Sequence, residues 1–156
     1  MAKGMGKIIA QNRKAHHDYF IEETYEAGIV LMGSEIKSIR MHRVNINDAY
    51  IDFDRGEAYI NGMHISPYKF ETKIKLDPIR KRKLLLHKKE INRLMGLVQR
   101  QGYTIIPLKI YIKDGFAKLE IAVAKGKKQF DKREAIKRRD ADREMRRAIK
   151  DRYLDR

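Results

Sequence analysis

Apolar residues alternate with polar ones in two pairs of short segments, which is the spacing of half-buried β-strands. The first pair lies on either side of residues 54–56, and the second, expected over 106–112 and 117–123, lies on either side of residues 113–115. Each intervening segment contains a glycine, which adopts positive φ without strain. Both pairs are therefore predicted to be β-hairpins.

Other segments show different spacings. Alternation over residues 25–31 predicts a further strand, and Ser34 is expected to cap a short helix that follows it. Pro107 falls inside a strand pattern and predicts an edge or a bulge there. A longer amphipathic helix, ending near Gly102, is predicted from four apolar residues at helical spacing, Ile91, Leu94, Met95 and Val98.

The order of these elements predicts the fold class. Several short strands, with one helix between an early meander and a final hairpin, give no β-α-β alternation. We expect a mainly β protein, an oligonucleotide-binding (OB)-type closed barrel with flanking helices and a basic C-terminal tail. The expected parts are a loose basic arm over 1–11, the RNA-binding barrel over 12–124 and the tail over 125–156.

The tail differs from the rest in composition. Residues 125–156 hold 14 Lys and Arg against seven Asp and Glu, a net charge of +7, and large apolar residues are sparse. Asp131 is placed to cap a helix, with Glu134 three residues later as its capping-box partner. Such a segment is expected to be disordered when free and to become helical against a polyanion.

Charge changes the picture for the whole chain. The 156 residues carry 36 Lys and Arg against 21 Asp and Glu, a net charge of +15. A charge of this size on a small protein favours a polyanionic partner, most often nucleic acid. There is no cysteine, which excludes disulfides and thiolate chemistry, and no apolar run near the ~20 residues of a membrane helix. We expect a cytoplasmic protein with no membrane partner.

Candidate catalytic chemistry is weak. His16, His17 and Asp18 are adjacent, so their side chains diverge on a helix or a strand and are not placed to chelate together. Asp52 and Asp54 flank a turn and suit ordinary turn chemistry. No phosphate-binding glycine loop or nucleophile elbow occurs. The sequence therefore predicts no catalytic residue, no metal site and no cofactor.

Basic clusters are the stronger signal. Three of them suit phosphate contacts: residues 12–14, the pair Lys37 and Arg40, and residues 80–83. The aromatic residues between them fit strand positions better than a stacking platform for single strands. Folded RNA, recognised by shape and phosphates, is the better-fitting partner.

Longer blocks carry a resemblance to a known family. They are residues 12–15, 17–28, 35–40, 82–87, 126–128 and 131–133. In this order and spacing the chain resembles the bacterial SsrA-binding proteins, also called small protein B. The resemblance runs through nearly the whole chain from about Ile9.

This resemblance implies a fold and a function. The family has an OB-type barrel with flanking helices and no catalytic activity. It binds the tRNA-like part of transfer-messenger RNA (tmRNA) and brings it to ribosomes stalled on messages without a stop codon. Elongation factor Tu with GTP and alanyl-tRNA synthetase act through the RNA, and a degradation tag is added to the incomplete protein. The tail enters the decoding site and the vacant message channel.

The resemblance and the basic clusters together give the candidate site residues. Those expected to bind RNA are Asn12, Arg13, Lys14, Glu26, Lys37, Arg40, Arg80, Arg82, Lys83 and Leu86. Those expected to act on the ribosome are Lys127, Lys128, Phe130, Asp131, Lys132, Arg133, Lys137 and Arg138. Two positions depart from the family: Phe130 stands where relatives often have Tyr or His, and His42 stands where Gly is usual.

Two other functions remain open on the sequence alone. One is a structural ribosomal protein with an rRNA-penetrating tail, which would remain on most ribosomes in high salt. The other is an RNA-processing enzyme that uses His16 or His17, which a metal-free nuclease assay on structured RNA would reveal.

Overall fold

A computed structural model of the chain gives the fold, and its described residues are 6–70, 76–127 and 143–147. The helices are α1 (Ala15–Asp18), α2 (Gly33–Arg40) and α3 (Lys88–Gln101), and residues 143–147 are also helical. The strands are β1 (Lys7–Gln11), β2 (Tyr19–Ile29), β3 (Val44–Asn45), β4 (Tyr50–Asp54), β5 (Glu57–Asn61), β6 (His64–Ile65), β7 (Arg82–Leu85), β8 (Thr104–Lys113) and β9 (Phe116–Gly126). The prediction of a mainly β protein is confirmed.

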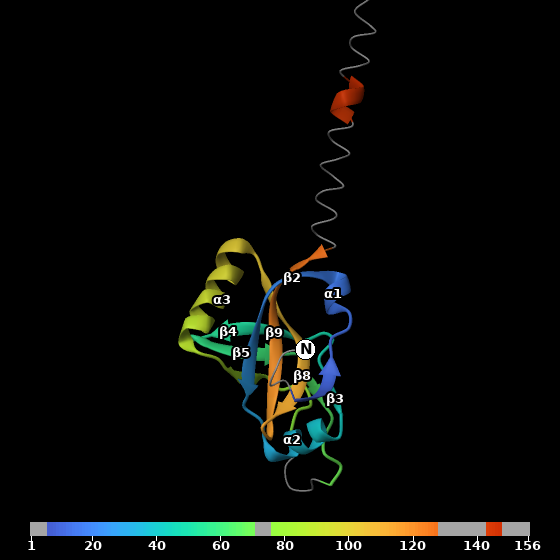
Figure 1. The fold of residues 1–156 in the computed structure, drawn as a ribbon, viewed down its shortest axis with the longest axis vertical. Coiled ribbons are helices and arrows are strands. Elements are labelled where there is room, and N and C mark those ends of the chain that lie inside the picture. The colour runs from blue at the N-terminus through green and yellow to red at the C-terminus, as the bar shows by residue number, and fades with distance from the viewer. Residues whose placement is uncertain (1–5, 71–75, 128–142, 148–156) are drawn as a thin grey trace, which may run out of the picture.

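Six of the strands pair in a closed circuit, called here the strand ring. Its hydrogen bonds run β8–β4–β5–β7–β2–β9 and return from β9 to β8, and each pair is antiparallel. β1 adds to β8, and β3 and β6 form a separate small ladder. Figure 1 shows α3 beside β4 and β5 near one end of the ring, and α2 at the other end.

Both predicted hairpins are present. The β4–β5 turn uses Arg55 and Gly56, and the β8–β9 turn uses Asp114 and Gly115, with φ between 52° and 82° at all four residues. Two consecutive positive φ angles are typical of the two-residue turn that matches strand twist. The pairing of β8 with β9 shifts after Pro107, so the predicted irregularity is a bulge.

The main core lies inside the ring. Alternate side chains of the ring strands face it, and Ile39 of α2 with Ile91 and Leu94 of α3 complete it. A second cluster lies under α1 on the other face of β8 and β9, where Ala15 packs with Ile106, Leu108, Ala122 and Ala124. Burial on both faces explains why β8 and β9 are rich in apolar residues at successive positions.

Three boundaries differ from the sequence prediction. Residues 7–11 form β1, paired with β8, and are not part of a loose arm; Ile9 packs into the main core. Helix α2 begins at Gly33, after Met32, whose amide donates to the Glu35 carboxylate at 2.8 Å, so Ser34 is not the cap. β9 continues to Gly126, which pairs with Tyr19, so the folded domain extends beyond residue 124.

Candidate nucleic-acid interface

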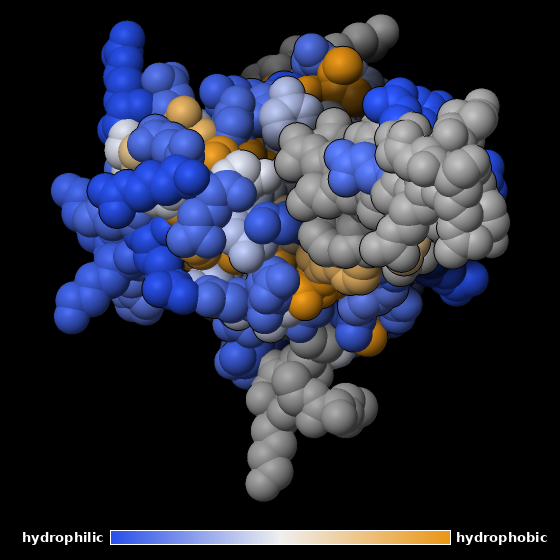
Figure 2. All heavy atoms as spheres, turned by 90° about the horizontal axis from the view of Figure 1, so that it is seen from above, coloured by the Kyte–Doolittle hydropathy of each residue, from blue (hydrophilic) through white to orange (hydrophobic). Residues whose placement is uncertain are grey.

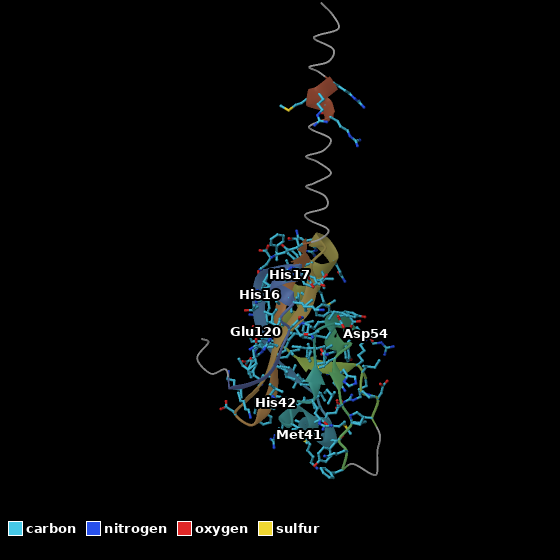
Figure 3. The ribbon with its side chains drawn as sticks, turned by 90° about the vertical axis from the view of Figure 1, so that its right-hand side faces the viewer. His16, His17, Met41, His42, Asp54 and Glu120 are labelled. Atoms are coloured by element: carbon cyan, nitrogen blue, oxygen red, sulfur yellow. The ribbon has the colours of Figure 1, made fainter. Side chains whose placement is uncertain are left out.

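The cations of the first two clusters are exposed but lie far apart. Arg13 and Lys14 precede α1, whereas Lys37 and Arg40 lie on α2. Figure 3 shows His16 and His17 of α1 towards one end of the ring, and the residues just after α2 towards the opposite end. Among the described residues, none of these four cations takes part in an ion pair. They are free for phosphate contacts, but they do not form one patch.

Asn12 is buried and has a structural role. Its side-chain amide donates to the carbonyl of Pro107 at 3.1 Å, and its backbone amide donates to Leu108 at 2.7 Å. These bonds fix the end of β1 at the bulge in β8. The sequence placed Asn12 among the RNA contacts; it is 6% exposed, its Oδ1 has no hydrogen-bond partner among the described residues, and its role in RNA binding stays a prediction.

The third basic cluster divides between two faces of β7. Successive side chains of a strand point to opposite sides. Arg82 therefore points inward and is 1% exposed, while Lys83 points outward and is 42% exposed beside Glu57 at 3.7 Å. Lys81 lies outside too, 3.7 Å from Asp52 and over the ring of Tyr59. Arg82 was predicted as an RNA contact; its side chain is 1% exposed and lies in the wall of a pocket, and its role in RNA binding stays a prediction.

Arg80 and Arg82 converge on Glu35, and the three are called here the buried triad. Glu35 is 4% exposed; its carboxylate accepts from Arg80 at 2.6 Å and from Arg82 at 2.6 Å. Arg82 also donates to the carbonyls of Met63 at 2.7 Å and Pro78 at 3.1 Å. Burial opposes ionisation of Glu35, but the hydrogen bonds from Arg80, Met32 and Arg82 outweigh it and lower its pKa. The triad joins α2 to β7 and the segment before it.

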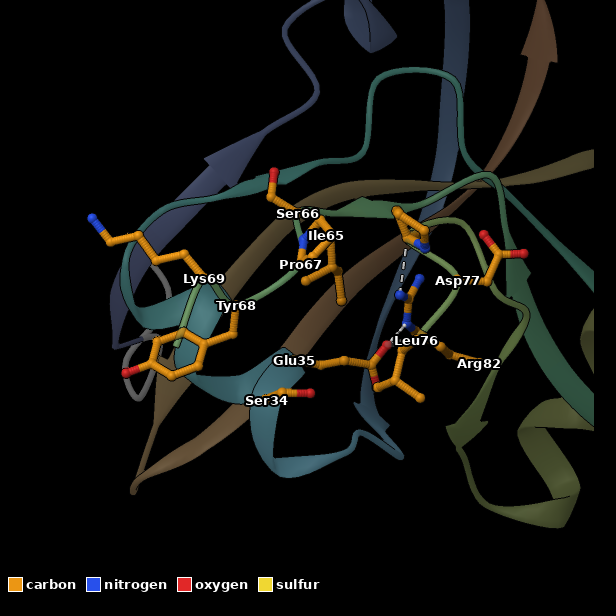
Figure 4. Close-up of a pocket in the computed structure, with 11 residues that line it drawn as sticks. Ser34, Glu35, Ile65, Ser66, Pro67, Tyr68, Lys69, Leu76, Asp77 and Arg82 are labelled. Atoms are coloured by element: carbon orange, nitrogen blue, oxygen red, sulfur yellow. Dashed lines mark hydrogen bonds and ion pairs between the residues drawn. The ribbon is translucent and has the colours of Figure 1, made fainter. Parts of the chain in front are cut away.

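A pocket of about 450 Å³ opens beside the triad. Figure 4 shows Glu35 and Arg82 on one side of it and Tyr68 and Lys69 on the other. The Lys37 amine lies 5.3 Å from the centre of the Tyr68 ring. Both oxygens of Glu35 already accept from an arginine, and two guanidinium groups against one carboxylate leave the buried triad with one net positive charge.

A groove of about 360 Å³ brings three predicted site residues together. Glu26 of β2, Lys83 of β7 and Leu86 line it, and Lys118 and His87 lie in the same lining. Its lining holds two amines and three carboxylates, since Glu57 and Glu90 join Glu26, together with apolar leucine side chains. Such a surface suits RNA, where the amines meet phosphates and the carboxylate of Glu26 accepts from a base N–H or a ribose hydroxyl. We call it the Glu26 groove.

Glu26 is held from one side. The hydroxyl of Tyr111 donates to its Oε2 at 2.5 Å, and the Lys113 amine lies 3.3 Å from both oxygens. The bond from Tyr111 lowers the pKa of Glu26; burial opposes this, and Lys113 and then Lys118 add to the lowering. Glu26 is therefore a carboxylate at neutral pH.

The start of the tail is attached to α1. The Lys127 amine donates to the carbonyl of His16 at 2.9 Å and lies 5.2 Å from the centre of the Phe20 ring. Residues 143–147 are helical with exposed side chains. The other predicted tail residues, Lys128, Phe130, Asp131, Lys132, Arg133, Lys137 and Arg138, lie outside the described residues.

The surface and the histidines complete the description. The face seen in Figure 2 is mainly hydrophilic, with small apolar patches. His16 and His17 are exposed, and His17 lies 2.9 Å from Asp18. In the described ranges, no group of three or more His, Asp or Glu is placed to hold a metal ion, and no helix there is long and apolar enough to cross a membrane.

Sequence reasoning missed Glu35, Tyr111 and Lys113. Glu35 was part of a matched block, but nothing in a short helix signals that its single carboxylate is buried. Tyr111 alternates with Ile110 and Ile112, so the sequence could have predicted that its side chain lies on the outer face of β8. Its hydrogen bond to Glu26, 85 residues away, could not be predicted from a local pattern.

The comparisons with known proteins match this chain over most of its length. The family model described as SmpB protein matches residues 9–151. An SsrA-binding protein of Geobacillus kaustophilus (strain HTA426) is 61% identical over 152 residues, with 97% of this chain and 98% of the relative covered. That of Bacillus subtilis (strain 168) is 56% identical over 151 residues, with 97% of each covered. A solved structure described as "tmRNA-SmpB: a journey to the center of the bacterial ribosome" matches with a TM-score of 0.64 and 48% identity, over 76% of this chain and 83% of that one.

Proposed function

The chain belongs to the SmpB family, and we infer that it works as a tmRNA-binding protein of trans-translation and is not an enzyme. The observation that carries this inference is the 61% identity to an SsrA-binding protein over 97% of the chain. The solved relative, whose description names tmRNA, SmpB and the ribosome together, supports the same partners. Ribosomes and tmRNA as partners imply the cytoplasm.

We propose that the strand ring is an OB-type barrel and that the Glu26 groove is part of its RNA-binding surface. The closed antiparallel circuit of six strands supports the fold assignment. For the surface, Lys83 and Lys118 line a groove that also holds Leu86 and the carboxylates Glu57 and Glu90. Since phosphates supply much of the affinity and base or sugar contacts fix the register, this combination suits one folded RNA element.

The exposed cations outside the groove extend this surface. Arg13 and Lys14 lie beside α1, next to the point where Lys127 is anchored. We propose that they contact the backbone of the same tRNA-like part of tmRNA. Lys37 and Arg40, at the other end of the ring, then contact RNA at a second point. In this arrangement Asn12, Arg80 and Arg82 support the surface from beneath.

We propose that the tail acts on the ribosome, in the decoding site and the vacant message channel. Its net charge of +7 over residues 125–156 favours a phosphate-lined passage. The anchored Lys127 would direct the following residues, with Lys128, Phe130, Asp131, Lys132, Arg133, Lys137 and Arg138 as the contacts. Elongation factor Tu with GTP and alanyl-tRNA synthetase would act through the RNA.

Recovery and sequencing of the RNA bound to the protein in cells tests the function. We expect tmRNA to be enriched far above other RNAs. Ribosomes should carry the protein substoichiometrically and lose it in high salt. Stoichiometric retention on ribosomes in high salt, with rRNA as the main recovered RNA, would instead identify a structural ribosomal protein.

A truncation tests the division of labour between ring and tail. The cut belongs after Lys127, because Lys125 and Gly126 still pair with Phe20 and Tyr19 in the β2–β9 ladder. The shortened protein should bind the tRNA-like part of tmRNA with nearly full affinity and fail to support tagging in a reconstituted translation reaction. Loss of specific RNA binding would show that the tail, not the ring, selects the RNA.

A further inference from the structure

Tyr111 is an unusual side chain for its position. It lies in β8, is 1% exposed, and its ring belongs to neither of the two apolar clusters. A buried tyrosine needs a partner for its hydroxyl. That partner is the Oε2 of Glu26, at 2.5 Å, on a strand 85 residues earlier in the sequence.

The carboxylate of Glu26 has one oxygen bonded to a buried group and is also partly exposed to solvent. Its side chain is 41% exposed and lines the Glu26 groove, while Oε2 is tied to the buried phenol. Within the described part of the chain, Oε1 has only the longer contact with Lys113, at 3.3 Å. On β9, Lys118 pairs with Tyr111 and Glu120 pairs with Glu26. The other charged or titratable groups of the groove lining are Glu57 of β5, Lys83 of β7, His87, and Glu90 of α3.

A carboxylate on a surface that binds phosphates needs to be restrained. Unheld, it would turn away from the incoming negative charge or take up a proton as the RNA approached. A buried donor fixes one oxygen in advance, so the ordering cost is met when the protein folds and not when RNA binds.

We propose that Tyr111 is a positioning residue for RNA recognition: it holds Oε2 of Glu26 so that Oε1 accepts a hydrogen bond from a base N–H or a ribose hydroxyl. This inference rests on the proposed function of the Glu26 groove. An ionised carboxylate only accepts hydrogen bonds, so it selects a donor group and rejects a phosphate oxygen. The recognised RNA must therefore present a donor at this point of its fold.

The chain offers a matched control on β2, the strand that carries Glu26. Tyr25 donates to Oε2 of Glu23 at 2.6 Å, and Arg93 of α3 completes that pair. Tyr25→Phe thus removes the same kind of bond from β2, but away from the Glu26 groove. Tyr111→Phe keeps the ring and removes only the hydroxyl, so the sheet should remain folded, as circular dichroism would verify.

Affinity for the transcribed tRNA-like part of tmRNA, at fixed salt, is the first readout. Tyr111→Phe should weaken binding about five- to tenfold, the usual range for a lost bond to a charged group when only part of it is felt in binding. In the Glu26→Gln background the same change should have little further effect, and Tyr25→Phe should have none. Equal losses from Tyr111→Phe in both backgrounds would mean a merely structural role and overturn the proposal.

The pH profile of binding is the second readout. The bond from Tyr111 holds the pKa of Glu26 down, so its removal should raise that pKa. The acid limb of the affinity profile should then move to higher pH in Tyr111→Phe, and stay in place in Tyr25→Phe. Carbon NMR of the Glu26 carboxyl would report the same shift without RNA; an unchanged titration would overturn the proposal.

The outcomes separate the two levels of inference. If Glu26→Gln keeps full affinity, the proposed role of the Glu26 groove fails, and the positioning role fails with it. If Glu26→Gln weakens binding but Tyr111→Phe does not, only the positioning role fails and the groove stands.

Discussion

The buried triad gives the sharpest prediction about stability. Glu35→Gln keeps the size of the side chain and removes its charge. The guanidinium of Arg82, 1% exposed, would keep its bonds to the carbonyls of Met63 and Pro78 but lose its only carboxylate partner among the described residues. Arg80 would lose the same partner and turn towards solvent, since it is already partly exposed.

The structure sets the magnitude. Removing one partner of a buried ion pair costs about 3–5 kcal/mol, because the remaining charge stays in a poorly hydrated place. A typical domain has only about 5–15 kcal/mol of unfolding free energy in total. For a chain of this length each kcal/mol lowers Tm by about 2–4 °C, so a decrease of roughly 10 °C is expected.

Thermal and urea unfolding followed by circular dichroism measure this effect. Glu57→Gln is the matched control, because it removes an exposed pair with Lys83, in which both side chains are about 40% exposed. Such a pair contributes about 0–1 kcal/mol. The double variant Glu35→Gln with Arg82→Met should recover part of the lost stability, since no buried charge remains there. A loss no larger for Glu35→Gln than for Glu57→Gln would refute the reasoning.

Acid adds a second signature of the triad. The pKa of Glu35 is lower in the folded protein than in the unfolded chain. Its contribution is therefore complete above the unfolded pKa and is lost as pH falls through the folded value. The stability difference between the wild type and Glu35→Gln should be constant near neutral pH and shrink below about pH 4. A difference that grows on acidification would contradict this sign.

Further predictions concern binding, the α2 turn and the tail. If about five phosphates are neutralised, log K for the tRNA-like RNA should fall with log of salt at a slope of roughly −3.5 to −4.5, and a slope near zero in a titration series would remove the electrostatic argument. His42 has a φ of 60° and its ring contacts the carbonyl of Ile9 at 3.2 Å; His42→Gly should be about 1 kcal/mol more stable than His42→Ala, because both lose the ring and only glycine relieves the backbone. Equal urea midpoints would argue against that strain. Proline at both Ile136 and Met145 costs a helix about 3 kcal/mol or more at each position, so this variant should bind RNA normally and fail at tagging; full tagging would show that the tail works without a helix.

The local patterns predicted the hairpins and the long helix because short-range chemistry decides them. A glycine in the second position of each turn and an apolar stripe ending at Gly102 determine the local backbone, and Gly102 has a φ of 69°. The prediction of a loose arm was wrong at residues 7–11, because a long-range contact decides their structure. Five residues hold too little periodicity, and β1 forms because residues 109–112 of β8, about 100 residues later, lie beyond the pairing with β4 and are open to another strand.

The candidate site was predicted as a set of residue types, and burial could not be read in the same way. The run 80–83 is uniformly basic in sequence, yet the strand alternation of β7 sends Arg82 inside and Lys83 outside. Strand alternation could be inferred from Leu84 onward. The buried carboxylate that accepts a hydrogen bond from Arg82 is Glu35 of α2, 47 residues earlier. Long-range pairing of this kind leaves no local pattern.

The blocks shared with the family therefore mix two kinds of residue. Within residues 35–40, Glu35, Ser38 and Ile39 are buried, while Lys37 and Arg40 point to solvent. A residue that contacts RNA and a residue that supports it from beneath can stand in the same block, because losing either one would disable the surface. Burial and partners separate them: an arginine bonded to a buried carboxylate holds the fold, and a lysine on the outer face remains available for phosphate. Substitution of Arg82 should accordingly reduce function in step with the loss of folding stability. Substitution of Lys83 should reduce RNA affinity by an amount that depends on the salt concentration.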